Sequence, residues 1–278
     1  MKLGIIGVGF VGEALFNGLK ESVEVKKIDP KLNTKVKDLV SFEPNIIFIC
    51  VPTPMNDDQK QDLSILKKVI REIIENNINS MIVLKSTVLP NHINEIQSLV
   101  PKLVYNPEFL TEKNALDDFI NTNFIILGGN KDYLDDIKQF YLDFTFCKCQ
   151  EYFTTDLMTA SLIKYSINSF LASKVIFFNQ LKDIFNLSGT NETWENFISA
   201  VSMDERIGSS HMNVPGHDGR NGFGGACFPK DTNAFLEYSK ELGAEFSLLK
   251  EVIKVNNSIR SSYNDVTARE KDQNTNFE

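Results

Sequence analysis

Short apolar runs alternate with amphipathic stretches over the first 150 residues. Six of the runs have the length and composition of strands: KLGIIG, VEVKKI, NIIFICV, SMIVLK, KLVY and NFIILGG. Between several of them, residues 11–20, 62–77 and 131–143 carry apolar residues at helical spacing. Continuous apolar strands that alternate with amphipathic helices are typical of a parallel sheet covered on both faces. The pattern therefore predicts an α/β domain with a doubly wound parallel sheet over residues 1–150.

The second half shows a different pattern, because the strand signals stop after Thr154. Residues 155–187 keep a helical apolar rhythm with no internal Gly or Pro. This rhythm predicts one long helix, with Thr154 or Thr155 as its N-cap and its end near Gly189.

Shorter helices are predicted around a Gly-rich loop at 208–226, and they cover about 192–202, Pro229 to Leu242 and 246–260. Residues 151–262 are thus expected to form an all-helical central domain. Residues 263–278 are polar and without periodicity, which predicts a tail without regular structure.

The composition excludes several classes of function. The 278 residues carry 29 Lys plus Arg against 37 Asp plus Glu, a formal charge of −8, so nucleic acid is not an expected partner. No apolar run reaches the roughly 18 residues of a membrane span, and the chain begins with a strand instead of a signal peptide, which predicts a cytoplasmic protein. Four cysteines and three histidines lack disulfide-scaffold and zinc spacing, so we expect reduced thiols and no metal site.

A glycine motif follows the first strand. Gly7, Gly9 and Gly12 form GVGFVG ahead of a predicted helix, and Asp29 ends the next strand. Gly7 would allow a tight turn, Gly9 would let the backbone approach a pyrophosphate, and Gly12 would let helix and strand pack closely. The helix N-terminus would bind the phosphates, and Asp29 would accept hydrogen bonds from the adenosine ribose, which favours NAD over NADP. The motif predicts a Rossmann-type dinucleotide site; an accidental Gly-rich turn is the alternative.

Two loops follow the third and fourth strands, where doubly wound sheets place ligand contacts. The first is CVPTP at 50–54, which a Pro-stiffened turn also explains, with Cys50 as a core thiol. The second contains Lys85-Ser86-Thr87. Thr87 would face the nicotinamide side of the crevice, or it would simply end the strand.

The stretch GFGGACFPKD at 222–231 has the features of a nucleophile site. A Gly-rich loop delivers Cys227 two residues before Pro229, which suits a first helical turn. The positive helix end and the adjacent Lys230 would favour the thiolate, and Asp231 could hydrogen-bond a partner or cap the helix. A buried packing cysteine is the competing interpretation.

Four polar residues elsewhere are further candidates. Lys164 and Asn168 stand four apart on the long helix and interrupt a mostly apolar surface, so they face either a polar substrate or solvent. Glu108 and Glu112 follow the strand KLVY, where a carboxylate could act as a general base or cap a helix.

In its motifs and their order the chain resembles the UDP-glucose/GDP-mannose dehydrogenases. These are NAD-dependent enzymes that oxidise the C6 alcohol of a nucleotide sugar to a carboxylate. The matching segments span about residues 1–260: GVGFVG with Asp29, VPTP, KSTV, NPEFLTE, SLIKYSINSFLASKVIFFN, DERIG, VPGHDGRNGFGGACFPKD and VNNSIR. VPGHDG and GFGGACFPKD are more similar to the UDP-glucose 6-dehydrogenases than to the mannose branch.

The resemblance implies a role for individual residues. Cys227 would be the nucleophile that forms a thiohemiacetal and then a thioester. Lys164 and Asn168 would hold the C6 oxygen, with Asp231 orienting Lys164 or a water. Glu112 would contact the cofactor and serve as a base, and Thr87 would position water. Cofactor contacts are expected from Gly7, Gly9, Phe10, Val11, Gly12, Asp29, Pro52, Thr53, Thr87, Glu112 and Lys230. Substrate contacts are expected from Glu108, Phe109, Leu110, Lys164, Asn168, Phe223, Gly224 and, across a dimer interface, Arg206.

The resemblance also implies a homodimer through the long helix. It implies a further UDP-binding domain, on the order of a hundred residues, which this chain lacks and a separate chain could supply. The leading hypothesis is NAD-dependent oxidation of UDP-glucose to UDP-glucuronate. The alternatives are a catalytically silent NAD-binding dimerisation module, a dehydrogenase of another nucleotide sugar, and a two-step hydroxyacid dehydrogenase, which would leave the Cys227 loop without a purpose.

Overall fold

The computed structural model describes residues 1–56, 58–263 and 265–277, with Glu112 described for its backbone only. The chain packs as two units. The first combines Met1–Thr53 with Gln61–Lys164, and the second combines Pro54–Lys60 with Tyr165–Glu278.

The first unit is built on a seven-stranded sheet in the order β2-β1-β3-β4-β5-β6-β7. Its strands are β1 (Lys2–Ile6), β2 (Glu24–Ile28), β3 (Ile46–Ile49), β4 (Met81–Leu84), β5 (Leu103–Tyr105), β6 (Phe124–Gly129) and β7 (Glu151–Thr155). The pairings among β1 to β5 are parallel, as predicted, but β6 runs antiparallel to β5. An apolar run carries no information on strand direction, so the pattern could not indicate this reversal.

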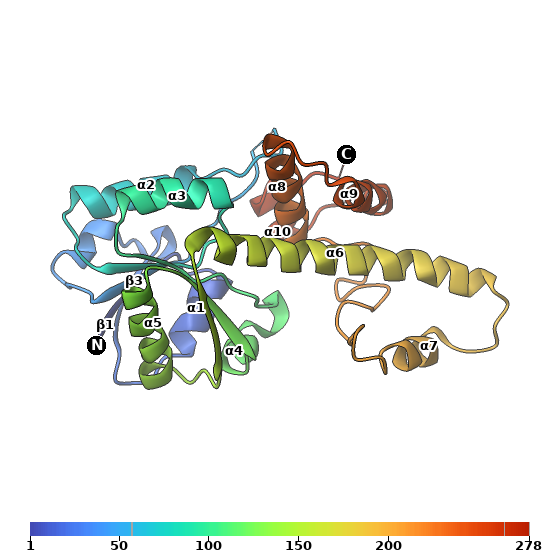
Figure 1. The fold of residues 1–278 in the computed structure, drawn as a ribbon, viewed down its shortest axis with the longest axis horizontal. Helices are drawn as coiled ribbons and strands as arrows, with labels where there is room; N and C mark the ends of the chain where they lie inside the picture. The colour runs from blue at the N-terminus through green and yellow to red at the C-terminus, as the bar shows by residue number, and fades with distance from the viewer. Residues whose placement is uncertain (57, 264, 278) are drawn as a thin grey trace. The chain divides into compact units, whose positions relative to one another are not determined.

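Helices cover both faces of this sheet. They are α1 (Phe10–Asn17), α2 (Ser64–Glu75), α3 (Pro90–Leu99), α4 (Ala115–Ile120) and α5 (Lys131–Phe144), with short 3₁₀ turns at Pro30–Leu32, Val36–Leu39 and Glu112–Asn114. In Figure 1, α2 and α3 lie on one face, and α1, α4 and α5 on the other. Strand residues alternate between the two cores, so that Ile47 and Ile49 pack under α2 while Ile46 and Phe48 pack with α5.

The beginning of the long helix differs from the prediction. Residues 151–155 form β7, which pairs in parallel with β6, and α6 (Leu157–Leu187) starts after it. The N-cap is Asp156, not Thr154 or Thr155, because its Oδ1 accepts the Thr159 N–H at 2.9 Å. Hydrogen bonds from Thr159 also lower the pKa of Asp156 below its usual value. The helix ends close to Gly189, whose φ of +73° is a common helix-ending conformation, as predicted.

The second unit is helical around the continuation of α6. Its other helices are α7 (Trp194–Val201), α8 (Phe228–Glu241), α9 (Ser247–Arg260) and α10 (Ala268–Asp272). One core cluster joins Ala172 and Ile176 of α6 to Phe223 and to Val252 of α9. The Gly-rich loop is therefore fixed at Phe223 by apolar packing within this unit.

The expectation of a tail without regular structure after residue 262 is wrong for the described residues. Thr267 and Glu270 form a capping box that starts α10, and the Glu270 side chain is fully buried. Phe277 is only 8% exposed. A five-residue helix is marginal on its own, so tertiary contacts supply the stability that the local sequence does not predict.

Among the described residues, no helix combines the length and the apolar character that crossing a bilayer requires. In the same part of the chain, the acidic, histidine and cysteine side chains form no group of three or more that could hold a metal ion.

Candidate active site

The glycine turn after β1 has the geometry that its three glycines were predicted to serve. Gly7 has a φ of +89°, and a Cβ there would lie 2.8 Å from the carbonyl carbon and oxygen of Cys50. A Cβ at Gly12 would collide with the Gly7 carbonyl oxygen, whereas one at Gly9 would meet no atom within 4 Å. Gly7 and Gly12 are therefore required by the fold, and the backbone at Gly9 is open to a ligand.

Asp29 closes this turn from the end of β2. Its Oδ2 accepts the Val8 N–H at 2.8 Å, and its Oδ1 accepts the Lys31 N–H at 2.9 Å. A carboxylate offers about four acceptor positions, so acceptor capacity remains for ribose hydroxyls. Helix α1 begins beside it at Phe10 with Gly9 as N-cap and no side-chain cap, which leaves backbone N–H groups for phosphate. These residues fit a dinucleotide.

The loops that follow β3 and β4 are held together by hydroxyl groups. Thr53 Oγ1 donates to the Thr87 carbonyl oxygen at 2.8 Å, and Ser86 Oγ donates to the Val51 carbonyl oxygen at 2.6 Å. Thr53 is buried and Thr87 half-buried, while Pro52 is exposed. These loops lie at the carboxyl ends of adjacent parallel strands, beside the point between β1 and β3 where strand order reverses. That is the place where such sheets bind ligands.

Lys164, near the beginning of α6, is brought against the loop after β5. Its Nζ lies 3.2 Å from Glu108 Oε1, donates to the Glu108 carbonyl oxygen, and stands 5.0 Å from the centre of the Phe109 ring. Lys164 is 2% exposed and Glu108 is 7% exposed, so this ion pair is buried. Glu108 Oε2 also accepts the Leu110 N–H at 2.7 Å, which fixes the carboxylate beside the lysine.

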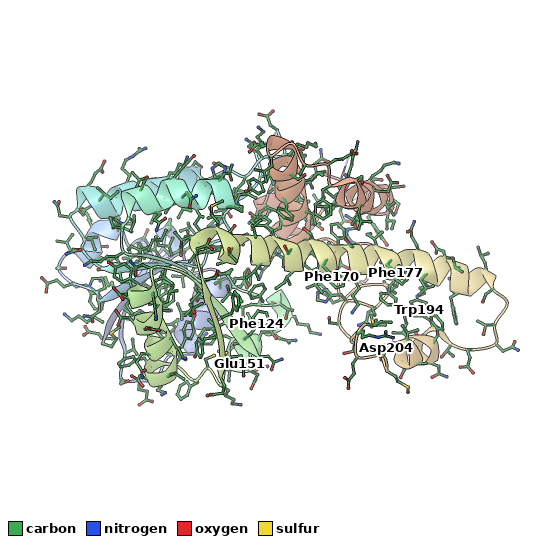
Figure 2. The ribbon with its side chains drawn as sticks, viewed as in Figure 1. Phe124, Glu151, Phe170, Phe177, Trp194 and Asp204 are labelled. Carbon is green, nitrogen blue, oxygen red and sulfur yellow. The ribbon has the colours of Figure 1, made fainter. Side chains whose placement is uncertain are left out.

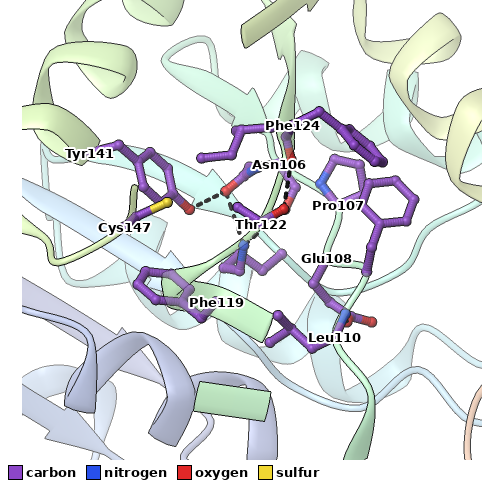
Figure 3. A pocket seen from close by; sticks show the side chains of 12 residues that line it. Asn106, Pro107, Glu108, Leu110, Phe119, Thr122, Phe124, Tyr141 and Cys147 are labelled. Carbon is purple, nitrogen blue, oxygen red and sulfur yellow. Dashed lines mark hydrogen bonds between the residues drawn. The ribbon is translucent and has the colours of Figure 1, made fainter. Parts of the chain in front are cut away.

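A second buried lysine, to which the sequence assigned no role, lies beneath this loop. Lys85 Nζ donates to Asn106 Oδ1 at 3.0 Å, and Tyr141 Oη donates to the same oxygen at 2.6 Å (Figure 3). Beside them is a cavity of about 30 Å³, large enough for a water molecule, which Cys147 and Glu108 also line. Burial lowers the pKa of Lys85 and raises that of Tyr141. The sequence offered one signal that could have identified Lys85, namely its position directly after an apolar strand.

In the second unit, Cys227 lies at the N-terminus of a helix, as the sequence predicted. It is the N-cap of α8, half-buried and reduced, and its carbonyl oxygen accepts the Asp231 N–H at 2.8 Å. Pro229 occupies the first turn, as expected. The sulfur is therefore attached at the positive end of a 14-residue helix.

Asp231 and Asn168 meet in the interior of the same unit. Asn168 Nδ2 donates to Asp231 Oδ2 at 2.6 Å, and Asp231 is fully buried. Lys230 Nζ pairs with Asp231 Oδ1. The ammonium of Lys230 is thus neutralised by its neighbour, so its expected electrostatic support of a Cys227 thiolate is reduced. The predicted contact of Asp231 with Lys164 stays a prediction, because Lys164 belongs to the first unit.

Phe223, Gly224 and Arg206 were also predicted to contact the substrate. The Phe223 ring is 4% exposed in the core, so contact of a sugar with this ring would require the loop to move. Gly224 is half-buried, and a Cβ there would collide with Arg260. Arg206 is on the surface, and its guanidinium binds Asp204 at 2.6 Å. The side chain of Glu112 lies outside the described residues.

Family models match most of the chain. The model for the NAD binding domain of the UDP-glucose/GDP-mannose dehydrogenase family matches residues 14–145, and that for the family's central domain matches residues 158–258. The chain is 36% identical over 218 residues to the UDP-glucose 6-dehydrogenase of Rickettsia bellii, covering 76% of this chain and 48% of that protein. It is 33% identical over 256 residues to UDP-glucose 6-dehydrogenase TuaD of Bacillus subtilis, covering 87% of this chain and 53% of that one. The chain therefore spans about half the length of these relatives.

Solved structures with the same fold include a UDP-glucose dehydrogenase from Pyrobaculum islandicum. It superposes with a TM-score of 0.76 at 25% identity, over 92% of this chain and 68% of that one. The 3-hydroxyisobutyrate dehydrogenase of Mycobacterium tuberculosis superposes with a TM-score of 0.72 at 13% identity, over 95% of each chain, a likeness of fold alone.

The matched domains and the glycine turn agree on the cofactor, since both predict NAD. One family model covers most of the sheet-forming part of the sequence, and the other covers most of the helical part. The chain therefore belongs to the UDP-glucose/GDP-mannose dehydrogenase family.

Proposed function

We propose that this chain oxidises the C6 alcohol of UDP-glucose to the carboxylate with two molecules of NAD, through covalent intermediates on Cys227. The observation that carries the proposal lies within the second unit. Cys227 begins α8, and one turn later the buried Asp231 holds Asn168. A cysteine at a helix N-terminus, one turn before a buried carboxylate that binds an amide, suits a covalent step better than packing does.

NAD would be held by the glycine turn, by Asp29 and by the loops that contain Thr53 and Thr87. Pro52 and Lys230 are further proposed contacts, as are Phe10 and Val11 at the start of α1. When bound, NAD supplies a hydride acceptor, once for the alcohol and once for the thiohemiacetal.

The chain's own residues would carry out the steps between the hydride transfers. The Cys227 sulfur adds to the aldehyde carbon, and the aldehyde oxygen takes a proton to complete the thiohemiacetal. Loss of a hydride and of the hydroxyl proton leaves a thioester. Water then attacks the thioester carbon, the carbon–sulfur bond breaks, and the thiol and the carboxylate are released. One alcohol, two NAD and one water are thereby consumed for two NADH.

Lys164 and Asn168 would stabilise negative charge on the C6 oxygen. The Lys164 ammonium is fixed by Glu108, and Asn168 uses one of its two amide hydrogens in the contacts described for the chain. Such fixed donors need no reorganisation when charge develops on an oxygen. Glu108, Phe109 and Leu110 would line the sugar site, Thr87 would position water, and Glu112 would act as a base near the cofactor.

We also propose a homodimer that forms through α6. Phe170, Phe177 and Ile184 repeat every seven residues along this helix, and their exposed fractions are 66%, 59% and 65%. Figure 2 shows Phe170 and Phe177 along α6. A row of large apolar side chains on one helix face is typical of an association surface. Arg206 would reach the substrate across this interface.

The test is NADH production from UDP-glucose and from a panel of other nucleotide sugars, with the chain alone and mixed with the C-terminal half of a relative. We expect two NADH per UDP-glucose, and at least about a 100-fold loss of turnover in Cys227→Ser. If NADH forms only with another nucleotide sugar, that sugar is the substrate in place of UDP-glucose. Absence of NADH in every mixture, with NAD still bound, would favour the second candidate.

That second candidate is a catalytically silent NAD-binding module. The observation in its favour is that the Lys230 ammonium pairs with Asp231 Oδ1, which reduces its electrostatic support of a Cys227 thiolate. It predicts stabilisation by NAD without turnover, so any sustained NADH production excludes it.

A further inference from the structure

Side chains of α6 and α9 form hydrogen bonds with the backbone of the loop that precedes Cys227. The Gly222 N–H donates to Asn179 Oδ1 of α6 at 2.9 Å. The Phe223 N–H donates to Asn256 Oδ1 of α9 at 2.7 Å, and Asn256 Nδ2 returns a hydrogen bond to the Phe223 carbonyl oxygen at 3.0 Å. Three successive peptide groups of the loop are thus fixed by amide side chains that are themselves buried.

The third support is an ion pair from α9 and α10. The Gly225 N–H donates to Glu270 Oε1 at 3.2 Å, and Arg260 Nη2 lies 2.7 Å from the same oxygen. Glu270 is fully buried and Arg260 is 2% exposed. Separating such a pair would leave a buried charge uncompensated, so the contact persists in the folded unit.

The second terminal nitrogen of Arg260 binds an earlier part of the same loop. Its Nη1 lies 2.8 Å from Asp218 Oδ2, so one guanidinium ties Asp218 to Glu270, and Glu270 in turn holds Gly225. A Cβ at Gly224 would collide with both Arg260 and Glu270. The backbone therefore rests directly on the charged pair, two to three residues before Cys227.

We propose that Glu270 and Arg260 are positioning residues for Cys227. They set the path of the loop from Asp218 to Gly225, and this path places the sulfur at the N-terminus of α8. The inference rests on the proposed function of Cys227 as the nucleophile. It makes the segment after α9 part of the nucleophile site, although its sequence predicted only a polar tail.

The experiment compares the full chain with Glu270→Gln, Glu270→Ala and Lys271→Gln. Glu270→Gln keeps the size of the side chain but removes the charge that holds Arg260, and Glu270→Ala removes the acceptor of the Gly225 N–H. Lys271→Gln changes an exposed neighbour on the same helix and is the matched control. Two readouts need no turnover: hydrogen exchange of the peptide over 219–226, and iodoacetamide alkylation of Cys227 followed by mass spectrometry.

In Glu270→Gln we expect exchange at 222–225 to rise at least about fivefold, because the loop loses a support. Alkylation of the half-buried Cys227 should accelerate about threefold as access improves. Where turnover is measurable, kcat should fall about tenfold with an unchanged KM for NAD, because the sulfur is misplaced while the glycine turn is untouched. Glu270→Ala should show larger changes in the same directions.

A folded Glu270→Gln variant with the exchange and alkylation of the control would overturn the proposal, as would faster exchange without a change in alkylation. If Glu270→Ala does not fold, Glu270→Gln decides the question. Lack of turnover in the unaltered chain would count against the proposed function alone, since exchange and alkylation still report the position of the sulfur.

Discussion

The three glycines after β1 show how single residues determine the local backbone geometry of this protein. Gly7 adopts a φ of +89°, and Gly12 has no space for a Cβ, whereas a Cβ at Gly9 would meet no atom within 4 Å. The first two serve the fold and the third leaves room for a ligand. Because the demands at Gly7 and Gly12 are stereochemical and local, the spacing alone predicted them correctly, whereas a pyrophosphate at Gly9 stays a prediction.

Gly9→Ala separates the two roles. Since its Cβ would meet no protein atom, we expect thermal stability to stay within about 1 kcal/mol of the unaltered chain. NAD affinity should fall at least about tenfold, because the methyl group occupies the space the pyrophosphate needs. Calorimetric titration with NAD measures the loss. Gly12→Ala is the contrasting variant and should lower stability by about 1–3 kcal/mol, since its Cβ collides with the Gly7 carbonyl. Unchanged NAD affinity in Gly9→Ala would contradict this placement of the cofactor.

The carboxylate of Glu270 should make the second unit sensitive to acid. Burial raises the pKa of Glu270, but N–H groups of Thr267 and Gly225 and the Arg260 guanidinium outweigh it and hold the pKa below its usual value. A lowered folded-state pKa contributes stability above the unfolded value of about 4.3, and this contribution is lost as pH falls through the folded pKa. Asp218, which shares Arg260, has a lowered pKa as well and adds to the effect.

We therefore expect Glu270→Gln to be less stable than the unaltered chain at pH 7, with a difference that shrinks below about pH 4.3. Urea unfolding between pH 7 and pH 3.5 measures it, with Lys271→Gln as the control that keeps the original pH dependence. A difference that is constant over this range would show that the loss is not electrostatic.

Helices and strands with strong periodicity were predicted nearly to their ends, whereas α3, α4, β7 and α10 were not predicted. β7 has the sequence EYFTT, and three of its five residues are exposed at the edge of the sheet. Helix α10 is five residues long. Neither has a local pattern that differs from a loop, because pairing with β6 and the burial of Glu270 supply their stability.

The exposed apolar row of α6 leads to a prediction about association. Phe170→Glu places a charge in the row and should raise the dimer dissociation constant at least about tenfold if the row is buried between two copies. Sedimentation velocity over a concentration series measures this constant. Phe146→Glu is a matched control, because Phe146 is 53% exposed outside α6. Equal dissociation constants for the two variants, or a monomer at every concentration, would argue against a dimer through α6.

Over the whole chain, the division into two units separates the proposed roles. The glycine turn, Asp29 and Lys164 lie in the first unit, and Asn168, Cys227 and Asp231 lie in the second. Turnover would therefore require both units, whereas NAD binding would require only the first.

In thermal unfolding, NAD at about 100 times its dissociation constant should stabilise the first unit by about 2.7 kcal/mol. Glu270→Gln should lower the stability of the second unit and leave the NAD-induced shift of the first unchanged. Calorimetry with and without NAD measures both effects, and tryptophan fluorescence adds a probe of the second unit, since the one tryptophan, Trp194, lies there. Loss of the NAD-induced shift in Glu270→Gln would show that the units unfold as one.

Local signals were enough to predict the alternating α/β half, the glycine turn, the long helix and the place of Cys227 at a helix N-terminus. Each of these depends on backbone stereochemistry or on a periodicity that is visible within about twenty residues. Contacts between distant residues decided the rest: β6 runs antiparallel to β5, Asn168 donates to Asp231, Lys85 is buried against Asn106, and Glu270 returns to hold Gly225. A buried charge has no preferred partner until the chain has folded around it, so no pattern along the sequence could name these pairs.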